Sequence, residues 1–152
     1  MGEGPAIAAA TREQIEARIG DTPAARLLGR RLVEFDHESG SALVSFEADE
    51  RFLNSAGMVQ GGIVAAMLDE TVGPALFSTL GDDEWAPTTD LHAQFLAPVY
   101  PGPLLGRGRV VKRGRSIAYL AGELMRTDGT VVATAMATVN VRRRDGQPRR
   151  VD

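Results

Sequence analysis

The stretch NSAGMVQGGIVAAMLDETVGPALFSTL, residues 54–80, decides the fold of this chain. It opens with a polar, glycine-rich turn and continues as about eighteen residues that predict one helix, apolar on nearly every side. A helix that is hydrophobic all round belongs inside a protein, with other elements packed about it. Asp69 and Glu70 interrupt it. Burying carboxylates is costly unless they are paired, hydrogen-bonded or used, so this pair is the first candidate for chemistry.

Segments with strand character surround the predicted helix. Before it, residues 32–35 and 42–48 flank a turn and predict a hairpin. After it come a polar loop at 81–84 and four strands, at 88–96, 104–112, 117–125 and 131–141. An Asp-Gly pair marks the last hairpin. We therefore predict an α+β fold, with an antiparallel sheet of five or six strands wrapped around one long central helix.

The last strand carries small residues on one face, namely Ala133, Ala135 and Ala137. Successive side chains of a strand point to opposite sides, so these three alanines share a side of the sheet. A face of small side chains suits close packing against a helix. We expect this face to lie under the central helix.

The two ends of the chain show weaker patterns. Residues 1–10 are small and featureless, and Thr11 predicts the N-cap of a short helix that reaches to about Ile19. Pro23 opens a second short turn that runs through Leu28. The predicted division is a tail with short helices at 1–29, one domain at 30–142, and a solvated basic tail at 143–152.

Composition excludes several classes of protein. The formal charge of −3 is too small to indicate nucleic acid or a membrane surface as a partner. The absence of cysteine excludes disulfides, thiolate metal sites and cysteine nucleophiles. The N-terminus lacks the pattern of a signal peptide, so we expect a cytoplasmic protein. Neither His37, expected in a solvated turn, nor His92, expected at a subunit contact, has companions for a metal site.

The start of the predicted helix offers an anion-binding feature. The free backbone N–H groups of Gly61 and Gly62 would point outward, where the helix dipole favours negative charge. A carbonyl oxygen resting there would be polarised, and one such donor contributes roughly 3–4 kcal/mol of transition-state stabilisation. The alternative is that the two glycines only permit a tight turn.

Asp69 follows Gly61 by eight residues, which places it about 12 Å further along the helix at 1.5 Å per residue. A single ester or thioester carbon cannot contact both groups of one helix. If both act on one substrate, two antiparallel helices from two subunits must supply them, so we expect at least a dimer. Glu70 points about 100° away, so only one of the two acids should face a given site. The alternative for Asp69 is a bond to an arginine or the main chain.

The run from Asn54 to Asp69 resembles the hotdog-fold acyl-CoA thioesterases of the PaaI-like, phenylacetate-degradation type. That family shows an Asn, a Gly, a His-Gly-Gly, and an acid eight residues after the first of those glycines. The matching positions here are Asn54, Gly57, Gln60, Gly61, Gly62 and Asp69. The resemblance continues through residues 88–98 and 112–116 into the last strand, and covers about residues 30–142.

The resemblance implies hydrolysis of an acyl-CoA thioester by a homodimer or homotetramer, without metal or bound cofactor. Asp69 would act as general base or as nucleophile, and the Gly61 amide of the partner would hold the thioester oxygen. Asn54 would orient the water or the carboxylate, and Thr88 would help to place the water. The implied contacts to substrate and coenzyme A are Gly57, Gln60, Gly62, Arg113, Gly114 and Arg115.

Two positions depart from the family pattern. Gln60 replaces the usual His, so its side chain can form hydrogen bonds but cannot transfer protons. Phe52 stands where many relatives have another His. Two alternatives therefore stay open: a hydratase or dehydratase of acyl thioesters, which generally needs that His, and a protein that binds acyl-CoA without turnover. We expect the packing of Phe52, Met58, Met67 and Phe77 to set the pocket length.

Overall fold

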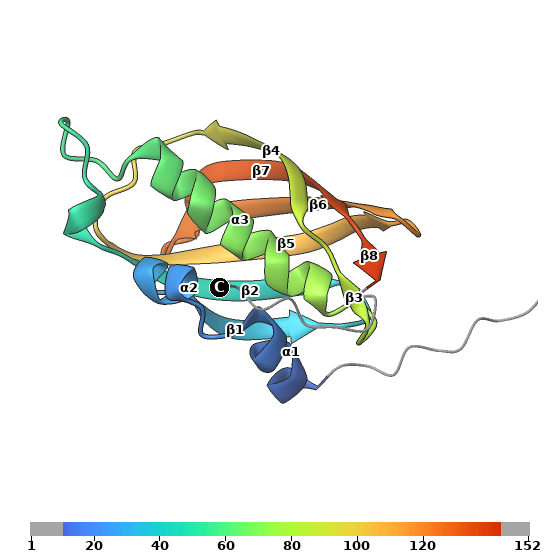
Figure 1. The fold of residues 1–152 in the computed structure, drawn as a ribbon. Helices are drawn as coiled ribbons and strands as arrows, with labels where there is room; N and C mark the ends of the chain where they lie inside the picture. Colours follow the sequence, from blue (N-terminus) through green and yellow to red (C-terminus); the bar gives the residue numbers. More distant parts are fainter. Residues whose placement is uncertain (1–10, 144–152) are drawn as a thin grey trace, which may run out of the picture.

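One long helix lies across an antiparallel sheet (Figure 1), in a computed structural model that describes residues 11–143. The sheet has six strands in the order β1-β2-β5-β6-β7-β4, and β3 and β8 form a separate two-stranded sheet. The elements are α1 Arg12–Ile19, α2 Pro23–Leu28, β1 Arg31–Asp36, β2 Ser41–Ala48, η1 Glu50–Phe52, α3 Gly61–Phe77, β3 Glu84–Trp85, β4 Thr88–Phe95, β5 Gly102–Arg113, β6 Ile117–Arg126, β7 Val131–Asn140 and β8 Arg142–Arg143. The predicted α+β architecture is confirmed.

Capping explains why the short N-terminal helices form where the sequence predicts them. The Thr11 side chain accepts from the backbone N–H of Gln14, and the Gln14 side chain accepts from the N–H of Thr11, which is a capping box. Thr22 caps α2 in the same way through the N–H of Ala25, and Pro23 occupies the first helical position. Both predicted helices are confirmed.

Glycines in β5 bring α3 close to the sheet. A Cβ atom at Gly106 or Gly108 would collide with Thr71 of α3, and one at Gly122 of β6 would lie 2.8 Å from Val72 Cγ1. Only residues without a side chain permit this approach. The hydroxyl of Thr71, fully buried at the contact, donates to the Met67 carbonyl at 2.7 Å, so no polar group is left unpaired there.

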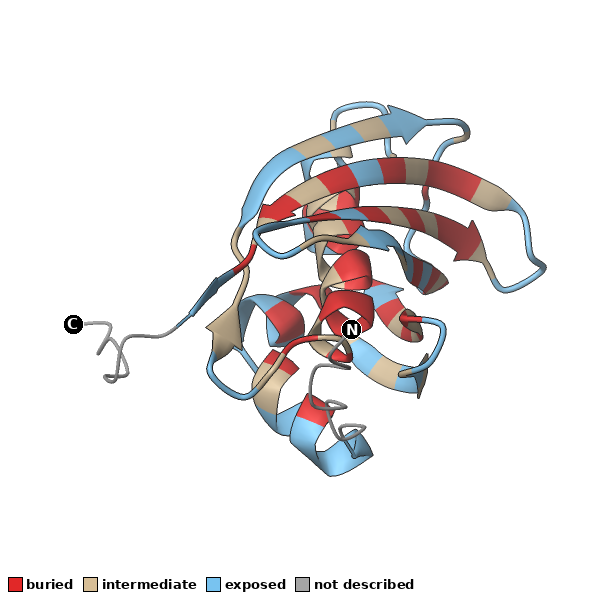
Figure 2. Cartoon of the chain, turned by 90° about the vertical axis from the view of Figure 1, so that its right-hand side faces the viewer, coloured by how far each residue is buried: buried red, intermediate tan, exposed pale blue. Residues whose placement is uncertain are grey.

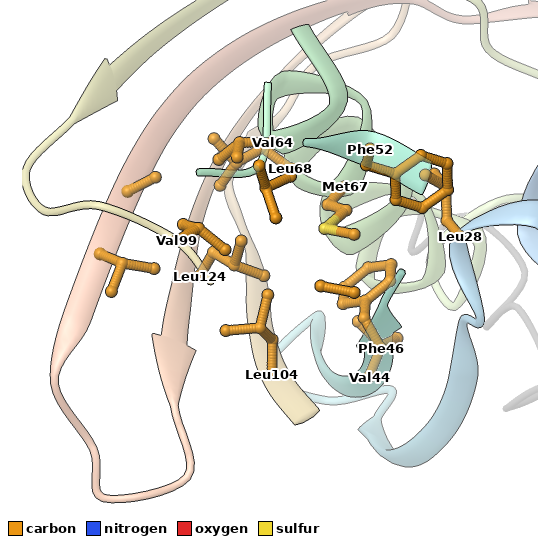
Figure 3. Close-up of a cluster of buried hydrophobic side chains, with 14 of the residues drawn as sticks. Leu28, Val44, Phe46, Phe52, Val64, Met67, Leu68, Val99, Leu104 and Leu124 are labelled. Carbon is orange, nitrogen blue, oxygen red and sulfur yellow. The ribbon is translucent and has the colours of Figure 1, made fainter. Parts of the chain in front are cut away.

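The core fills the space between α3 and the concave face of the sheet (Figures 2 and 3). Figure 3 shows Phe46, Met67, Leu68 and Leu124 among the buried side chains that meet there. In Figure 2 buried residues alternate with less buried ones along the inner strands of the sheet, whereas the edge strand β4 is mostly exposed. The small face of β7 is buried as predicted, with Ala133, Ala135 and Ala137 at most 4% exposed.

Two local predictions are wrong. Glu84 does not end a loop but begins β3. It pairs with Arg143, the first residue of the predicted solvated tail, which is exposed but belongs with Arg142 to β8. His37 is half-buried rather than solvated, because its Nδ1 lies against the carbonyl oxygen of Ser78 at the end of α3. The predicted tail at residues 1–10 and the rest of the basic tail, from 144 on, lie outside the described residues.

The two edges of the main sheet differ. The edge strand β1 is covered by Arg12 of α1, whose guanidinium donates to the carbonyl oxygens of Leu32 at 2.8 Å and Val33 at 3.1 Å. The opposite edge strand, β4, pairs only with β7 within residues 11–143. An unpaired row of backbone N–H and C=O groups is a template for another strand.

Candidate active site

A tight loop leads into α3 and fixes where the helix begins. The side-chain Oδ1 of Asn54 accepts from the backbone N–H groups of Ala56 at 2.9 Å and Met58 at 3.2 Å, and the Asn54 N–H donates to the Met58 carbonyl at 2.7 Å. Gly57, with a φ of 77°, supplies the left-handed turn that the loop needs. Asn54 therefore shapes this loop. Its role toward water stays a prediction.

The first residues of α3 present free backbone donors. Gln60 is the N-cap, its side chain forms no capping hydrogen bond, and it is exposed. Within residues 11–143 the N–H groups of Gly61 and Gly62 reach no acceptor, as expected for the first turn of a helix. The far end of the Phe95 ring of β4 lies 3.6 Å from where a Cβ of Gly61 would be, so this ring borders the start of the helix.

A cavity of about 320 Å³ opens beside this helix start. Its lining is mostly apolar and combines the loop, α3 and the end of β4: Asn54, Met58, Val59, Gly61, Val64, Phe95, Leu96, Ala97, Pro98 and Val99. Met58 thus lines a cavity as predicted, while Phe52 and Met67 are buried in the core.

Asp69 and Thr88, chosen separately from the sequence, meet in the structure. Thr88, the first residue of β4, donates its hydroxyl proton to Asp69 Oδ1 at 2.9 Å. The contact orients the carboxylate and leaves its other oxygen available. Both residues line a second cavity of about 280 Å³, which Gly61 does not reach. In one chain, the helix-start amides and the carboxylate therefore open into different cavities.

Glu70 lines the same cavity as Asp69, so the prediction that only one acid can face a site is wrong. A cavity that curves around the helix spans more than the 100° between neighbouring residues. The two acids nevertheless differ in their partners. Glu70 Oε2 accepts from Arg30 Nε at 2.6 Å, and the Arg30 side chain is only 3% exposed. Glu70 is thus committed to an ion pair, and Asp69 is not.

Arg113, expected at the exit of coenzyme A, is held inside the chain. Its guanidinium donates to Glu84 Oε2 at 2.8 Å and to the carbonyl of Gly114. Burial acts to raise the pKa of Glu84, but the Gly81 N–H and the Arg113 guanidinium outweigh burial and hold that pKa below its usual value. Arg113 therefore serves an ion pair in this chain.

Arg115 is exposed and borders a third cavity of about 390 Å³. The sequence analysis did not place Arg142 and Arg143 at this cavity, although both line it with Glu84 and Ser116. The run of arginines was visible in the sequence. Its position depended on the β3–β8 pairing, which two-residue strands do not reveal.

The Asp69 cavity also contains residues that sequence reasoning missed. Ile19 of α1, Thr22 before α2 and Arg30 after it form one side of the cavity, some forty to fifty positions away from Asp69 along the chain. No local motif signals such a contact. Only the packing of the N-terminal helices onto α3 reveals it.

Residues 11–143 contain neither a three-residue metal-binding group nor a membrane-spanning helix. In that part of the chain, His, Asp and Glu side chains form no group of three that could hold a metal ion. None of its helices has the length and apolarity to cross a membrane.

Comparison with known proteins gives consistent results. A family model described as the thioesterase superfamily matches residues 56–133. A candidate esterase of Saccharolobus solfataricus is 32% identical over 101 residues, which cover 66% of this chain and 71% of that protein. The structure of a candidate thioesterase of Ralstonia eutropha JMP134, related to phenylacetic acid degradation, matches with a TM-score of 0.78 at 38% identity, covering 83% of this chain and 98% of that one. The PaaI protein of E. coli, from the phenylacetic acid degradation operon, shares the fold with a TM-score of 0.69 at 22% identity, covering 77% and 86% of the two chains.

Proposed function

Since the chain belongs to the thioesterase superfamily, as a hotdog-fold member of the PaaI-like type, we propose that it hydrolyses acyl-CoA thioesters at a site shared by two copies of the chain. Membership supports thioester hydrolysis in general. The acyl-CoA substrate and the shared site are the specific parts of the proposal. The observation that carries it is the carboxylate of Asp69, fixed by Thr88 in a cavity separate from the helix-start amides.

The free edge of β4 supports a particular arrangement of two chains. Suppose that two β4 strands pair antiparallel about a two-fold axis at the middle of the strand, between Leu91 and His92. Thr88 of one chain then lies opposite Phe95 of the other, because β4 runs from Thr88 to Phe95. Thr88 holds Asp69, and Phe95 borders Gly61. The pairing would bring the carboxylate of one chain to the amides of its partner, which one helix cannot do.

Within such a site each group has a chemical task. Asp69 accepts a proton from a water molecule, whose oxygen attacks the thioester carbonyl carbon. The carbonyl oxygen becomes an oxyanion, which the N–H groups at Gly61 and Gly62 of the other chain stabilise. The tetrahedral intermediate collapses by breaking the carbon–sulfur bond, and the thiolate of coenzyme A takes up the proton. In the alternative route, Asp69 attacks the carbonyl itself and water hydrolyses the resulting anhydride.

Gln60 and Arg115 have supporting roles in the proposal. The exposed amide of Gln60 stands beside the helix-start donors and can hydrogen-bond to substrate without transferring a proton. Arg115 is exposed and available to contact phosphates of coenzyme A, and Arg113, whose guanidinium pairs with Glu84, lies two residues before it. Asn54 and Gly57 act by shaping the loop that presents the amides.

The proposal is tested by comparing how fast wild-type and Asp69→Asn protein release free thiol from acyl-CoAs. We expect the substitution to lower kcat by about 10²–10⁴, the usual contribution of a general base, with no change in assembly by size-exclusion chromatography. Glu70→Gln is the matched control, since it alters the neighbouring carboxylate in the same cavity, and we expect a loss of only a few-fold. Equal activity of Asp69→Asn and wild type would remove Asp69 from the mechanism.

A further inference from the structure

The cavity beside Asp69 has a well-defined shape. Asp69, Gly73 and Phe77 line it from one side of α3, since residues four apart lie on the same helix face. Its apolar floor is formed by buried side chains of α3, β6 and β7: Val72, Leu76, Leu120 and Val139. The carboxylate therefore stands beside an apolar floor that suits a hydrocarbon group.

Gly73 leaves open the space next to the carboxylate. A Cβ atom placed on Gly73 would meet no heavy atom within 4 Å. Its φ does not lie in the left-handed region, so the backbone does not require glycine there. Glycine inside a helix is destabilising relative to alanine, and its missing side chain here opens the cavity one turn beyond Asp69.

The N-terminal helices close the cavity from outside, and two ion pairs hold them, of which Arg30–Glu70 is mostly buried and Arg18–Asp82 is exposed on the Asp82 side. Arg30 joins Glu70 of α3 to the end of α1, because the same guanidinium donates to the carbonyls of Ile19 at 3.1 Å and Gly20 at 2.9 Å. Arg18 donates to the Leu80 carbonyl at 2.8 Å and to Asp82 at 2.6 Å. Ile19 and Thr22 are thereby fixed as one wall of the cavity.

From these contacts we infer that this cavity receives the acyl group of the substrate, and that Gly73 and Phe77 determine the largest acyl group accepted. The inference rests on the proposed hydrolysis at Asp69. An apolar cavity of about 150 Å³ holds benzene, so about 280 Å³ holds a single ring or a chain of medium length, not a long fatty acyl chain. Arg18 and Arg30, the two arginines in the lining, are both paired, so the pocket favours uncharged acyl groups.

The test compares variants of the full-length protein on acetyl-, butyryl-, hexanoyl-, octanoyl-, dodecanoyl- and benzoyl-CoA, with thiol release as the readout. Gly73→Leu fills the open space, Gly73→Ala fills part of it, and Phe77→Ala lengthens the cavity. Pro74 follows Gly73 in α3 and disfavours the helical conformation for a preceding residue that has a Cβ. Circular dichroism therefore checks first that the Gly73 variants keep the helix, and Phe77→Ala tests the cavity independently of Pro74. The control is Ala17→Leu, which adds similar bulk on the exposed side of α1.

We expect Gly73→Leu to lower kcat/KM for octanoyl- and benzoyl-CoA by roughly tenfold or more relative to acetyl-CoA. One methylene group that no longer fits its pocket typically lowers kcat/KM by about tenfold or more. Gly73→Ala should show a smaller shift, Phe77→Ala should raise the relative rate on dodecanoyl-CoA, and Ala17→Leu should leave the profile unchanged. An equal loss on all substrates, an unchanged profile in Gly73→Leu, or a changed state of assembly would overturn the inference.

A wild-type protein that releases no thiol from any of these substrates would refute the proposed hydrolysis. The affinities for the same acyl-CoAs would then test whether this cavity receives the acyl group. Calorimetric titration with the same acyl-CoAs should give affinities that rise up to the octanoyl chain in wild type, and Gly73→Leu should abolish that rise. Affinities that do not depend on the acyl group, or no binding at all, would overturn the inference.

Discussion

At the scale of single residues, the central feature is the contrast between two adjacent carboxylates in one cavity. Thr88 holds Asp69 by a hydrogen bond from its hydroxyl, and Arg30 holds Glu70 in an ion pair. The first arrangement leaves a carboxylate oxygen available to a water molecule, and the second fixes the N-terminal helices to α3. Of these two neighbouring residues, Asp69 thus serves the proposed chemistry and Glu70 holds the N-terminal helices on α3.

Replacing Glu70 should affect stability more than turnover. In Glu70→Gln the buried guanidinium of Arg30 loses its charged partner and keeps only backbone carbonyls. We expect the free energy of unfolding to fall by about 1–3 kcal/mol, the usual effect of depriving a buried group of its partner. Urea denaturation measures it. Asp69→Asn should change stability much less, because Asp69 is paired only to the hydroxyl of Thr88. A larger loss of stability in Asp69→Asn than in Glu70→Gln would contradict the structural role given to Glu70.

The site could be predicted from the sequence where residues lie on one local pattern. Gly61 and Asp69 belong to one helix, and their spacing alone separated the two halves of the site. The partners of those residues could not be predicted in the same way. Arg30 reaches Glu70 across forty positions, and Glu84 reaches Arg113 across twenty-nine, so both contacts depend on the tertiary packing.

At the scale of elements, the position of α3 on the sheet depends on glycines in the strands beneath it. A methyl group at Gly106 would collide with Thr71. We expect Gly106→Ala to lower the free energy of unfolding by about 1–3 kcal/mol, as other overpacked cores do. Thr71→Ala removes the colliding atoms, so the double variant should lose less than the sum of the two single variants.

Thermal and urea denaturation of wild type, Gly106→Ala, Thr71→Ala and the double variant gives the four free energies of unfolding for this comparison. Strictly additive losses would mean that α3 does not lie against Gly106. The sequence analysis located the small face of β7 but not these glycines, because alternating glycines in a strand can equally indicate bulges or turns.

The ion pair between Glu84 of β3 and Arg113 of β5 predicts a pH dependence of stability. The folded state holds the pKa of Glu84 below its usual value, so the unfolded chain binds a proton first as the pH falls. The stabilisation is therefore complete above the ordinary Glu pKa of about 4.3, and it is lost as the pH falls through the lowered value.

Free energies of unfolding of wild type and Glu84→Gln, measured between neutral pH and about pH 3, check this prediction. The advantage of wild type over the variant should stay constant from neutral pH to about pH 5 and shrink below that. An advantage that grows on acidification would contradict the sign of the shift. Short strands such as β3 carry no periodicity, so this contact was beyond sequence prediction.

At the scale of the whole molecule, the proposed active site requires two copies of the chain. Among the residues that the structure describes, one edge of the sheet is covered by Arg12, and the other, β4, has free backbone groups. The edge strand carries Thr88 at one end and Phe95 at the other, so two-fold pairing would complete both sites at once. The expectation of a second chain followed from the separation of about 12 Å between Gly61 and Asp69 along one helix. The sheet edge that could provide the second chain became visible only in the strand order.

The most direct test uses a mixed dimer, with a different defect in each chain. Gly61→Pro removes one amide donor at the first helical position, where proline is tolerated, and Gly61→Ala keeps that donor as the matched control. Gln60 already has the extended backbone (φ −57°, ψ 134°) that a following proline requires. The second chain carries Asp69→Asn. Each variant alone should release thiol at a small fraction of the wild-type rate.

The mixed dimer of Gly61→Pro and Asp69→Asn chains, purified through two different tags, should recover about half of the wild-type rate of thiol release. In a two-fold dimer with shared sites, one of its two sites combines the intact Asp69 of the first chain with the intact Gly61 of the second. A mixed dimer as inactive as its parents would show that each chain carries its own complete site, and would contradict the shared site at the centre of this account.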